Sequence, residues 1–176
     1  MSFKDPETVL DQLVLGEGRV VADLGVGSGA YALSAARRVG GTGKVYAIDI
    51  QKHLLERLKN AAKTARLHNV EIIWGDIEKS AGTKIKNGVV DVAIISNALF
   101  QTEDKSAVAR EAHRILKNGG RALVVDWSET SGVLGPTAEH IVPQEEARDV
   151  FERNGFSHER DISAGEHHYG IIFRKK

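Results

Sequence analysis

The feature that most limits the fold of this chain is a run of alternating glycines, Gly25, Gly27 and Gly29, directly behind a short apolar segment. The segment, over about 19–25, has the composition of a strand that is buried on both faces. Glycine lacks a Cβ atom, so the backbone can turn sharply there and approach a ligand closely. Small and apolar residues then recur at helical spacing over about 29–39. A strand, a glycine turn and a helix N-terminus in this order predict a nucleotide-binding site.

The rest of the chain alternates between strand-like and helix-like segments, which predicts an α/β fold with a mostly parallel, seven-stranded sheet and helices on both faces. Further strands are expected at about 44–49, 70–74, 89–95, 122–126, 156–163 and 167–174. Helices are expected at about 6–15, 103–117 and 143–155, and between the second and third strands, where the inward face would carry Leu54, Leu58, Ala61, Ala62 and Ala65. Gly165 and Glu166 indicate a hairpin between the last two strands, so one edge of the sheet should be antiparallel. A turn is expected at 118–120 and a loop over the carboxyl edge of the sheet at 128–142.

Composition excludes several classes of function. The chain has 24 Lys and Arg residues against 24 Asp and Glu residues, so it has no general attraction for nucleic acid or anionic lipid, although a local basic patch stays open. It has no cysteine, which excludes disulfides, thiolate metal sites and cysteine nucleophiles. The N-terminus lacks the apolar stretch of a signal peptide, and apolar runs such as 92–95 are too short to span a bilayer. We therefore expect one domain over residues 1–176, located in the cytoplasm.

An acidic residue ends the second expected strand, where nucleotide-binding α/β folds place the carboxylate that binds ribose. That residue is Asp49, whose oxygens can accept hydrogen bonds from both ribose hydroxyls. The alternative is that it only caps the helix that begins near Gln51. Gly25, Gly27 and Ala30 also satisfy the dinucleotide fingerprint, so the glycine turn alone does not identify the ligand.

Three further features favour S-adenosylmethionine over a dinucleotide. Asp23 lies two residues before Gly25, where a dinucleotide-binding strand is normally apolar, and an acid there can organise the amides of the glycine turn and face a cationic ligand. Gly75 and Asp76 follow the third expected strand, where a carboxylate can accept a hydrogen bond from the adenine amino group. The chain also ends soon after the nucleotide-binding unit, without a second domain for a hydride acceptor.

Together these segments resemble the class I S-adenosylmethionine-dependent methyltransferases over nearly the whole chain. The matching segments are VADLGVGSG (21–29), VYAID (45–49), WGD (74–76), DVAIISN (91–97) and ILKNGG (115–120). Within that superfamily the chain is most similar to small-molecule enzymes of the quinone-biosynthesis C-methyltransferase and arsenite methyltransferase type. The resemblance implies a Rossmann-like methyltransferase fold and the transfer of a methyl group from S-adenosylmethionine to an acceptor, with S-adenosylhomocysteine as the product.

The resemblance also implies a role for each matching position. The residues expected to bind the cofactor are Asp23, Gly25, Gly27, Gly29, Asp49, Ile50, Gly75, Asp76, Ile77, Ser96 and Asn97. In this assignment the glycines line the methionine moiety, Asp49 holds the ribose and Asp76 holds the adenine amino group, while the isoleucine after each of these two aspartates packs alongside adenine. Ser96 and Asn97 would border the sulfonium and the incoming acceptor.

The chain departs from both of these enzyme types. The absence of cysteine excludes the thiolate chemistry of arsenite methyltransferases. Residues 98–101 read ALFQ, where quinone-type enzymes often carry histidines, and residues 96–99 lack the Asn-Pro-Pro-Tyr-like motif of enzymes that methylate amino groups. The resemblance therefore does not fix the acceptor. We expect a small molecule; methylation of RNA or protein stays an alternative, as does a non-catalytic cofactor-binding protein that needs a partner.

Candidates for contacts with the acceptor come from the loops at the same edge of the sheet. Phe100, Gln101 and Trp127 follow the fourth and fifth expected strands, where α/β folds bind substrates. Trp127 would either stack on a planar acceptor or close the edge of the core. A general base is needed only if the acceptor is protonated at the working pH. The candidate base is His140, because it lies in the expected lid over 130–142; the alternative is a solvated loop histidine. No metal site is predicted.

Overall fold

The computed structural model describes residues 4–132 and 135–176 of the chain. The strands are β1 (Val20–Leu24), β2 (Lys44–Asp49), β3 (Val70–Trp74), β4 (Val90–Ser96), β5 (Leu116–Trp127), β6 (Phe156–Ser163) and β7 (His168–Lys175). The α-helices are α1 (Pro6–Asp11), α2 (Ala30–Val39), α3 (Lys52–Thr64), α4 (Lys105–Ile115) and α5 (Gln144–Arg153), and two short 3-10 helices are η1 (Leu99–Gln101) and η2 (Ala138–His140).

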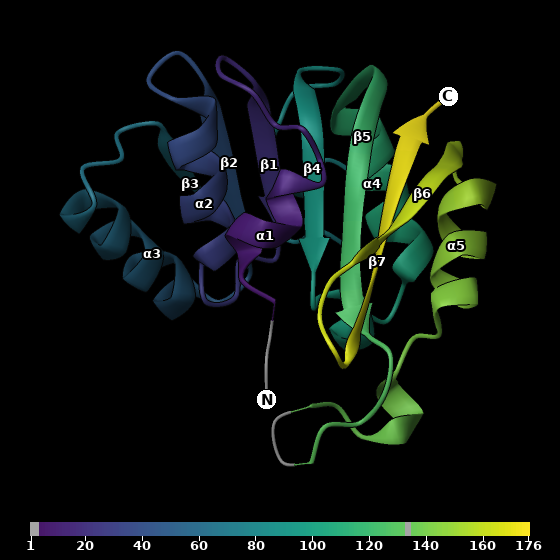
Figure 1. Cartoon of the computed structure of the whole chain (residues 1–176). Helices are drawn as coiled ribbons and strands as arrows, with labels where there is room; N and C mark the ends of the chain where they lie inside the picture. The colour runs from purple at the N-terminus through teal and green to yellow at the C-terminus, as the bar shows by residue number, and fades with distance from the viewer. Residues whose placement is uncertain (1–3, 133–134) are drawn as a thin grey trace.

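Within the described residues, the strands form one seven-stranded sheet in the order β3-β2-β1-β4-β5-β7-β6 (Figure 1). Strands β1 to β5 pair in parallel, whereas β7 is antiparallel to both β5 and β6. The α/β class, the mostly parallel sheet and the antiparallel hairpin at its edge are thus confirmed. Because β2 and β4 lie on opposite sides of β1, the connections that follow β1 and β4 diverge and leave a crevice at the carboxyl edge of the sheet.

Helices cover both faces of the sheet and create a hydrophobic core on each. Helices α1, α2 and α3 pack on one face, with Leu10, Ala35 and Leu58 buried beneath them. Helices α4 and α5 pack on the other face, where the rings of Phe151 and Phe173 stack with their centroids 4.9 Å apart. Two well-packed faces hold the sheet rigid, so the loops at its carboxyl edge start from fixed positions.

Two helices differ from the expectation. Helix α1 ends at Asp11 rather than near residue 15, and Val14 behind it adopts a positive φ of 54° and is exposed. The buried face of α3 carries Leu55, Leu58 and Ala62. The expected inward positions at 61 and 65 are exposed, because the helix packs through a narrower stripe than the one assigned from the sequence.

The expected turn at 118–120 lies inside a strand. Strand β5 begins at Leu116, which pairs with Val90, and the next registered pair is Val92 with Arg121. The residues between these two pairs therefore form an irregular bulge, in which Gly119 adopts a φ of 73°. Strand pairing begins earlier than the glycines suggested, because a bulge accommodates them without ending the ladder.

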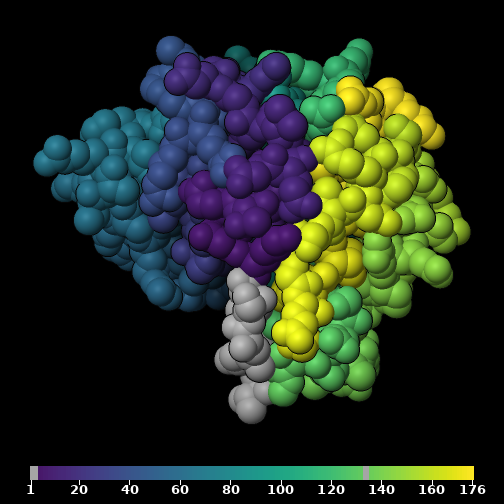
Figure 2. Space-filling view, in the orientation of Figure 1, coloured from purple at the N-terminus to yellow at the C-terminus, as the bar shows by residue number. Residues whose placement is uncertain are grey.

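The N-terminal helix lies directly against the C-terminal strands, as the purple and yellow surfaces show in Figure 2. The Gln12 side chain donates a hydrogen bond to the Ser163 carbonyl at 2.9 Å and accepts one from its amide at 3.1 Å. The Arg160 guanidinium donates to the Gln12 carbonyl. These bonds fix the residue that follows α1 against strand β6. In the ranges described, no helix is long and apolar enough to cross a membrane.

Candidate functional site

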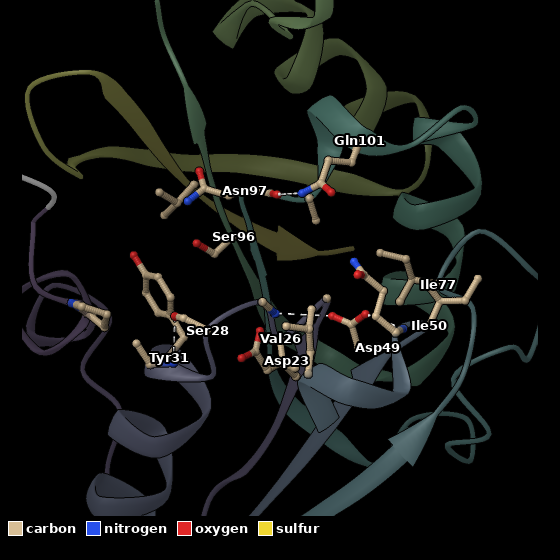
Figure 3. A pocket seen from close by; sticks show the side chains of 18 of the residues that line it. Asp23, Val26, Ser28, Tyr31, Asp49, Ile50, Ile77, Ser96, Asn97 and Gln101 are labelled. Atoms are coloured by element: carbon tan, nitrogen blue, oxygen red, sulfur yellow. Dashed lines mark hydrogen bonds between the residues drawn. The ribbon is translucent and has the colours of Figure 1, made fainter. Parts of the chain in front are cut away.

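A cavity of about 670 Å³ opens at the carboxyl edge of the sheet, around the end of β1. Its volume lies within the range of small-molecule and cofactor sites. The predicted residues that line it are Asp23, Gly25, Gly27, Asp49, Ile50, Gly75, Asp76, Ile77, Ser96, Asn97 and Gln101. Figure 3 shows Asp23, Val26 and Asp49 on one side of this cavity and Ser96 and Asn97 on the other. The fold thus brings together residues that are up to 78 positions apart in the sequence, from Asp23 to Gln101.

The glycine turn lines the cavity with backbone, as predicted for two of its three glycines. Gly25 has a φ of 90° and Gly27 a φ of 51°, which place both in the conformation that glycine adopts most readily. Gly29 does not line the cavity. It begins α2 with a φ of 82°, and a Cβ atom there would lie 2.7 Å from Cδ1 of Leu58. Gly29 therefore lets α2 and α3 pack closely, and its contact with the ligand stays a prediction.

Asp49 joins the end of β2 to the glycine turn. One carboxylate oxygen accepts a hydrogen bond from the Gln51 amide at 2.9 Å, and the other accepts one from the Gly27 amide at 3.3 Å. The side chain is nearly buried, with 7% of the residue exposed, and it lines the cavity. If Asp49 only capped α3, the hydrogen bond from Gln51 would be sufficient. The hydrogen bond from Gly27 and the position of Asp49 in the cavity are not explained by capping.

Asp23 is fully buried at the centre of the site. Neither of its carboxylate oxygens has a hydrogen-bond partner in the part of the chain that the structure describes. Burial raises the pKa of Asp23 to about 8, and the nearby Asp49 carboxylate adds to this shift. The Ala32 amide opposes the shift, although it does not reach normal hydrogen-bond geometry. The predicted bonds from Asp23 to the glycine-turn amides are therefore absent from these residues, because Asp49 accepts the Gly27 amide instead.

The connection after β3 supplies the far end of the cavity. One Asp76 oxygen accepts a hydrogen bond from the Glu78 amide at 2.9 Å, so the carboxylate is held in place beside the cavity. A Cβ atom at Gly75 would lie 2.3 Å from the carbonyl oxygen of Gly82, so only glycine fits there. Ile50 is 61% exposed and presents an apolar side chain at the rim.

A buried ion pair fixes the segment that packs behind Gly75. Glu111 of α4 accepts hydrogen bonds from the Ala81 amide and from the amide and hydroxyl of Thr83. Arg114 pairs with the same carboxylate at 2.7 Å. Although burial alone would raise the pKa of Glu111, these donors hold it below its usual range. The carboxylate is therefore charged at neutral pH and orders the segment.

The opposite side of the cavity carries uncharged hydrogen-bonding groups. Asn97 has a φ of 51°, a left-handed conformation that asparagine tolerates better than most residues. Its side-chain oxygen lies 2.9 Å from Nε2 of His168, and its carbonyl accepts a hydrogen bond from the Gln101 amide group at 2.8 Å. Burial lowers the pKa of His168, and the neighbouring His167 lowers it further.

Tyr31 and His168 also line this side of the cavity, although neither was predicted from the sequence as a site residue. The Tyr31 ring reaches from the first turn of α2 toward Ser96 (Figure 3). Burial raises the pKa of Tyr31 to about 12, while the Ser96 hydroxyl opposes that shift. Tyr31 lies two residues after Gly29, so its closeness to the glycine turn could have predicted that it lines the cavity. His168 gave no signal, because its position depends on the register between β5 and β7.

Asp126 is a further residue near the cavity that was not predicted from the sequence. It is fully buried, and its carboxylate accepts hydrogen bonds from the Leu99 amide at 2.9 Å and from the Trp127 amide at 2.8 Å. Burial raises its pKa to about 6, and these amides oppose the shift. Asp126 thereby holds the segment that leads from Asn97 into η1.

Three predicted acceptor or base residues do not line the cavity. Phe100 packs against the core. Trp127 is 4% exposed and packs on the His168 ring with the centroids 4.3 Å apart, so it closes the edge of the core, as the alternative reading of this residue required. His140 lies in η2, where its Nδ1 is 2.8 Å from the Thr137 hydroxyl and its side chain is 61% exposed. Its role as a base stays a prediction.

No cluster of three or more His, Cys, Asp or Glu side chains suited to a metal ion occurs among residues 4–132 and 135–176. The described lining of the cavity offers carboxylates, amide and hydroxyl groups and the bare backbone of the glycine turn.

Comparison with known proteins gives one family. Residues 15–169 match the family model described as a methyltransferase domain. Over 138 residues the chain is 34% identical to the ubiquinone/menaquinone biosynthesis C-methyltransferase UbiE of Escherichia coli, which covers 72% of this chain and 52% of that protein. It is 32% identical over 114 residues to a 2-phytyl-1,4-naphtoquinone methyltransferase of Nostoc punctiforme, covering 65% of this chain and 49% of that protein.

Among solved structures, an S-adenosylmethionine-dependent methyltransferase from Aquifex aeolicus superimposes with a TM-score of 0.89 at 26% identity, covering 99% of this chain and 90% of that one. The chain spans about half the length of the curated relatives it matches.

Proposed function

The chain belongs to the methyltransferase domain family, and on this basis we propose that it transfers a methyl group from S-adenosylmethionine to a small-molecule acceptor. The observation that carries the proposal is the buried Asp23 carboxylate in the cavity, whose oxygens have no hydrogen-bond partner among the described residues. A buried polar group without a partner is unfavourable, and a cationic ligand would remove this penalty. S-adenosylmethionine supplies two cationic groups, its sulfonium and its ammonium, and the sulfonium carries an activated methyl group.

The other lining residues fit the same ligand. Asp49 would hold the ribose hydroxyls, and Asp76 would accept a hydrogen bond from the adenine amino group. Ile50 and Ile77 would cover the apolar faces of the base. The glycine turn would leave room for the methionine moiety, with Asp23 opposite its charge. Each contact pairs a described residue with a group of matching polarity.

The residues of this chain contribute mainly by orientation. Methyl transfer is a direct displacement, so the site must hold the attacking atom close to the methyl carbon and in line with the bond that breaks. Such positioning supplies up to about 7–11 kcal/mol of barrier reduction. Asn97 and Gln101, which Asp126 and η1 hold in place, are suited to orient the acceptor.

A small acceptor is supported by the cavity volume of about 670 Å³ and by the lack of net charge on the chain. The relatives named above are methyltransferases of quinone biosynthesis and of a naphthoquinone, which are ring compounds. We extend a small-molecule acceptor to this chain as part of the proposal. A single catalytic domain over 1–176 and a cytoplasmic location stay predictions from the sequence.

Thermal unfolding with added ligands tests the cofactor. The experiment adds one compound at a time, either S-adenosylmethionine, S-adenosylhomocysteine, NAD or NADP. A ligand at a hundred times its dissociation constant stabilises the folded protein by about 2.7 kcal/mol. For a protein of this size, that raises the thermal midpoint by roughly 5–11 °C. We expect a shift with the two S-adenosyl compounds and none with NAD or NADP. The D49A variant should lose most of the shift. A shift with NAD alone would refute the proposal.

Transfer of a labelled methyl group then tests the acceptor, with quinols, phenols and amines compared against RNA and protein. Methylation of a small molecule is the expected result. Transfer only to RNA or protein would replace the small-molecule acceptor. Cofactor binding without transfer to any of them would indicate a non-catalytic binding protein.

A further inference from the structure

Trp74 is a large aromatic side chain on the surface next to the cavity. It ends β3, the strand at one edge of the sheet, and 52% of the residue is exposed. Its registered neighbour on β2 is Asp49, and Gly75 directly after it donates a backbone hydrogen bond to the Asp49 carbonyl at 3.1 Å. Trp74 itself does not line the cavity. It therefore lies where the connections after β2 and β3 begin, which carry the proposed ribose and adenine contacts.

The indole ring joins these two connections. Its Nε1–H donates a hydrogen bond to the carbonyl oxygen of Ile50 at 3.0 Å. In the same connection, the Asp49 carboxylate accepts hydrogen bonds from the Gln51 amide and from the glycine turn. The backbone after β2 is thus held toward β3 by Trp74 and toward the glycine turn by Asp49. Ile50, between these two attachments, presents its side chain at the rim of the cavity.

Two lysines contact the ring that makes this hydrogen bond. The Lys52 ammonium lies 4.1 Å from the centroid of the Trp74 ring, and the Lys84 ammonium lies 5.4 Å from it. Lys52 is the first residue of α3, where the helix dipole disfavours a positive charge, and Lys84 adopts a φ of 59°, which is uncommon for a lysine. Both lysines thus occupy locally unfavourable positions that their contact with Trp74 offsets.

Lys84 also connects Trp74 to a buried part of the molecule. Its ammonium donates a hydrogen bond to the Trp74 carbonyl at 2.6 Å. The residues before it, 81–83, donate backbone hydrogen bonds to the buried Glu111 carboxylate of α4. The contacts therefore run from α4 through Lys84 to Trp74 and on to the Ile50 carbonyl. A support of this kind holds residues that touch a ligand more precisely than a free loop does.

We propose that Trp74 is a positioning residue that sets the width of the adenine subsite. This inference rests on the proposed function, in which Ile50 packs on adenine and Asp76 accepts a hydrogen bond from the adenine amino group. Trp74 holds the first of these residues through its indole and the second through its main chain, because Gly75 and Asp76 follow it directly. Adenine that rests on Ile50 is thereby kept within reach of the Asp76 carboxylate.

Calorimetry with two ligands tests this role. S-adenosylhomocysteine carries the adenine amino group, and S-inosylhomocysteine has an oxygen in its place, which cannot donate to Asp76. Wild type should prefer the first ligand by about 10-fold or more, as expected for a hydrogen bond to a carboxylate. The comparison isolates the adenine end, because the two ligands share the ribose and the amino-acid group.

The W74F variant keeps an aromatic ring and removes the indole N–H. We expect the preference for S-adenosylhomocysteine to fall to about 3-fold or less in this variant, because adenine is no longer held against Asp76. Y46F is the matched control, since it also removes one polar atom from an aromatic side chain that a lysine contacts. The Lys44 ammonium lies 4.5 Å from the centroid of the Tyr46 ring, and Tyr46 does not line the cavity. Y46F should keep the wild-type preference.

A purely structural role of Trp74 would give a different pattern. Loosening of the whole protein would weaken the binding of both ligands by the same factor, and an unchanged preference in W74F would overturn the proposal. A wild-type protein without the preference would overturn it as well. If W74F does not fold, K84M decides, because it removes two contacts that hold Trp74 and leaves the indole in place. The preference should then fall by about 2-fold or more, and an unchanged value would again overturn the proposal.

The same titrations separate this inference from the proposed function. If wild type binds neither ligand, the proposed function fails together with the inference. If wild type binds S-adenosylhomocysteine with the expected preference and W74F keeps that preference, the inference alone fails.

Discussion

Replacing Asp23 by asparagine is expected to make the ligand-free protein more stable. Asp23 is fully buried, its oxygens have no hydrogen-bond partner within the described residues, and its pKa is raised to about 8. The folded protein therefore binds a proton at this position that the unfolded chain releases above about pH 4. As far as Asp23 is concerned, the free energy of unfolding is highest below pH 4. It then falls progressively as the pH rises toward 8.

The magnitude follows from the difference between the two pKa values. Each pH unit between about 4 and 8 lowers the free energy of unfolding by about 1.4 kcal/mol, so the loss reaches on the order of 4 kcal/mol at pH 7. Asparagine has nearly the same size and does not ionise. D23N should therefore exceed wild type by about 2–4 kcal/mol at pH 7 and by about 1–2 kcal/mol at pH 5.

Urea denaturation without ligand at pH 5, 6, 7 and 8 measures this difference directly. The D149N variant is the matched control, since Asp149 is an exposed aspartate whose nearest ion-pair contact is 3.7 Å long, and it should stay within about 0.5 kcal/mol of wild type. A D23N variant that is no more stable than wild type at pH 7 would refute the reasoning. So would a difference that does not grow between pH 5 and 8.

The same carboxylate should work in the opposite direction when the cofactor binds. A cationic ligand favours ionised Asp23, so binding of S-adenosylmethionine should release a proton and tighten as the pH rises toward 8. D23N should bind it about 10-fold to 100-fold more weakly, because a hydrogen bond to a charged group contributes roughly 1.5–3 kcal/mol. Calorimetry in buffers of different ionisation enthalpy measures both effects, and binding that releases no proton would contradict this role.

Three substitutions outside the cavity test how the scaffold is held. G29A should lower the free energy of unfolding by about 1–3 kcal/mol in urea denaturation, because alanine is strained at this φ and its Cβ meets Leu58; an unchanged value would show that the helices move apart freely. E111A should cost about 3–5 kcal/mol in the same assay, because it leaves buried donors unpaired, and a loss below 1 kcal/mol would contradict that. The Lys175 ammonium donates hydrogen bonds to two carbonyls at the end of α4, and K175M removes it. The thermal midpoint should fall by about 2–8 °C, and an unchanged midpoint would contradict this capping role.

The sequence was sufficient for the parts of the site that lie close to the motifs. Asp49 and Ser96 end strands, and the glycine turn and Asp76 come shortly after strands, all of which their composition identifies. Parallel strands bring their carboxyl ends to one edge of the sheet, where these residues line the cavity. Each motif therefore predicted that its residues meet those of the other motifs in one cavity. The α/β topology brings them together, because it aligns the carboxyl ends of the parallel strands.

The side of the cavity with uncharged groups was less predictable, because it depends on register and on side-chain direction. Trp127 and His168 form a registered pair between β5 and β7, and neither strand contains a signal that sets this pairing. The packing role of Gly29 was not predicted from the sequence either. Its contact with Leu58 of α3 depends on how two helices pack on the sheet. Such features follow from tertiary packing and not from local propensity.

Asp23 is the position where the local pattern and the fold disagree most clearly. A strand that is buried on both faces favours apolar residues, and an unpaired carboxylate there lowers the stability of the folded protein. A residue that breaks a local rule without a compensating contact in the fold points to a partner outside the chain. Since the cavity places Asp23 beside the glycine turn, we propose that the missing partner is a bound cation, whose binding would recover the free energy lost on folding.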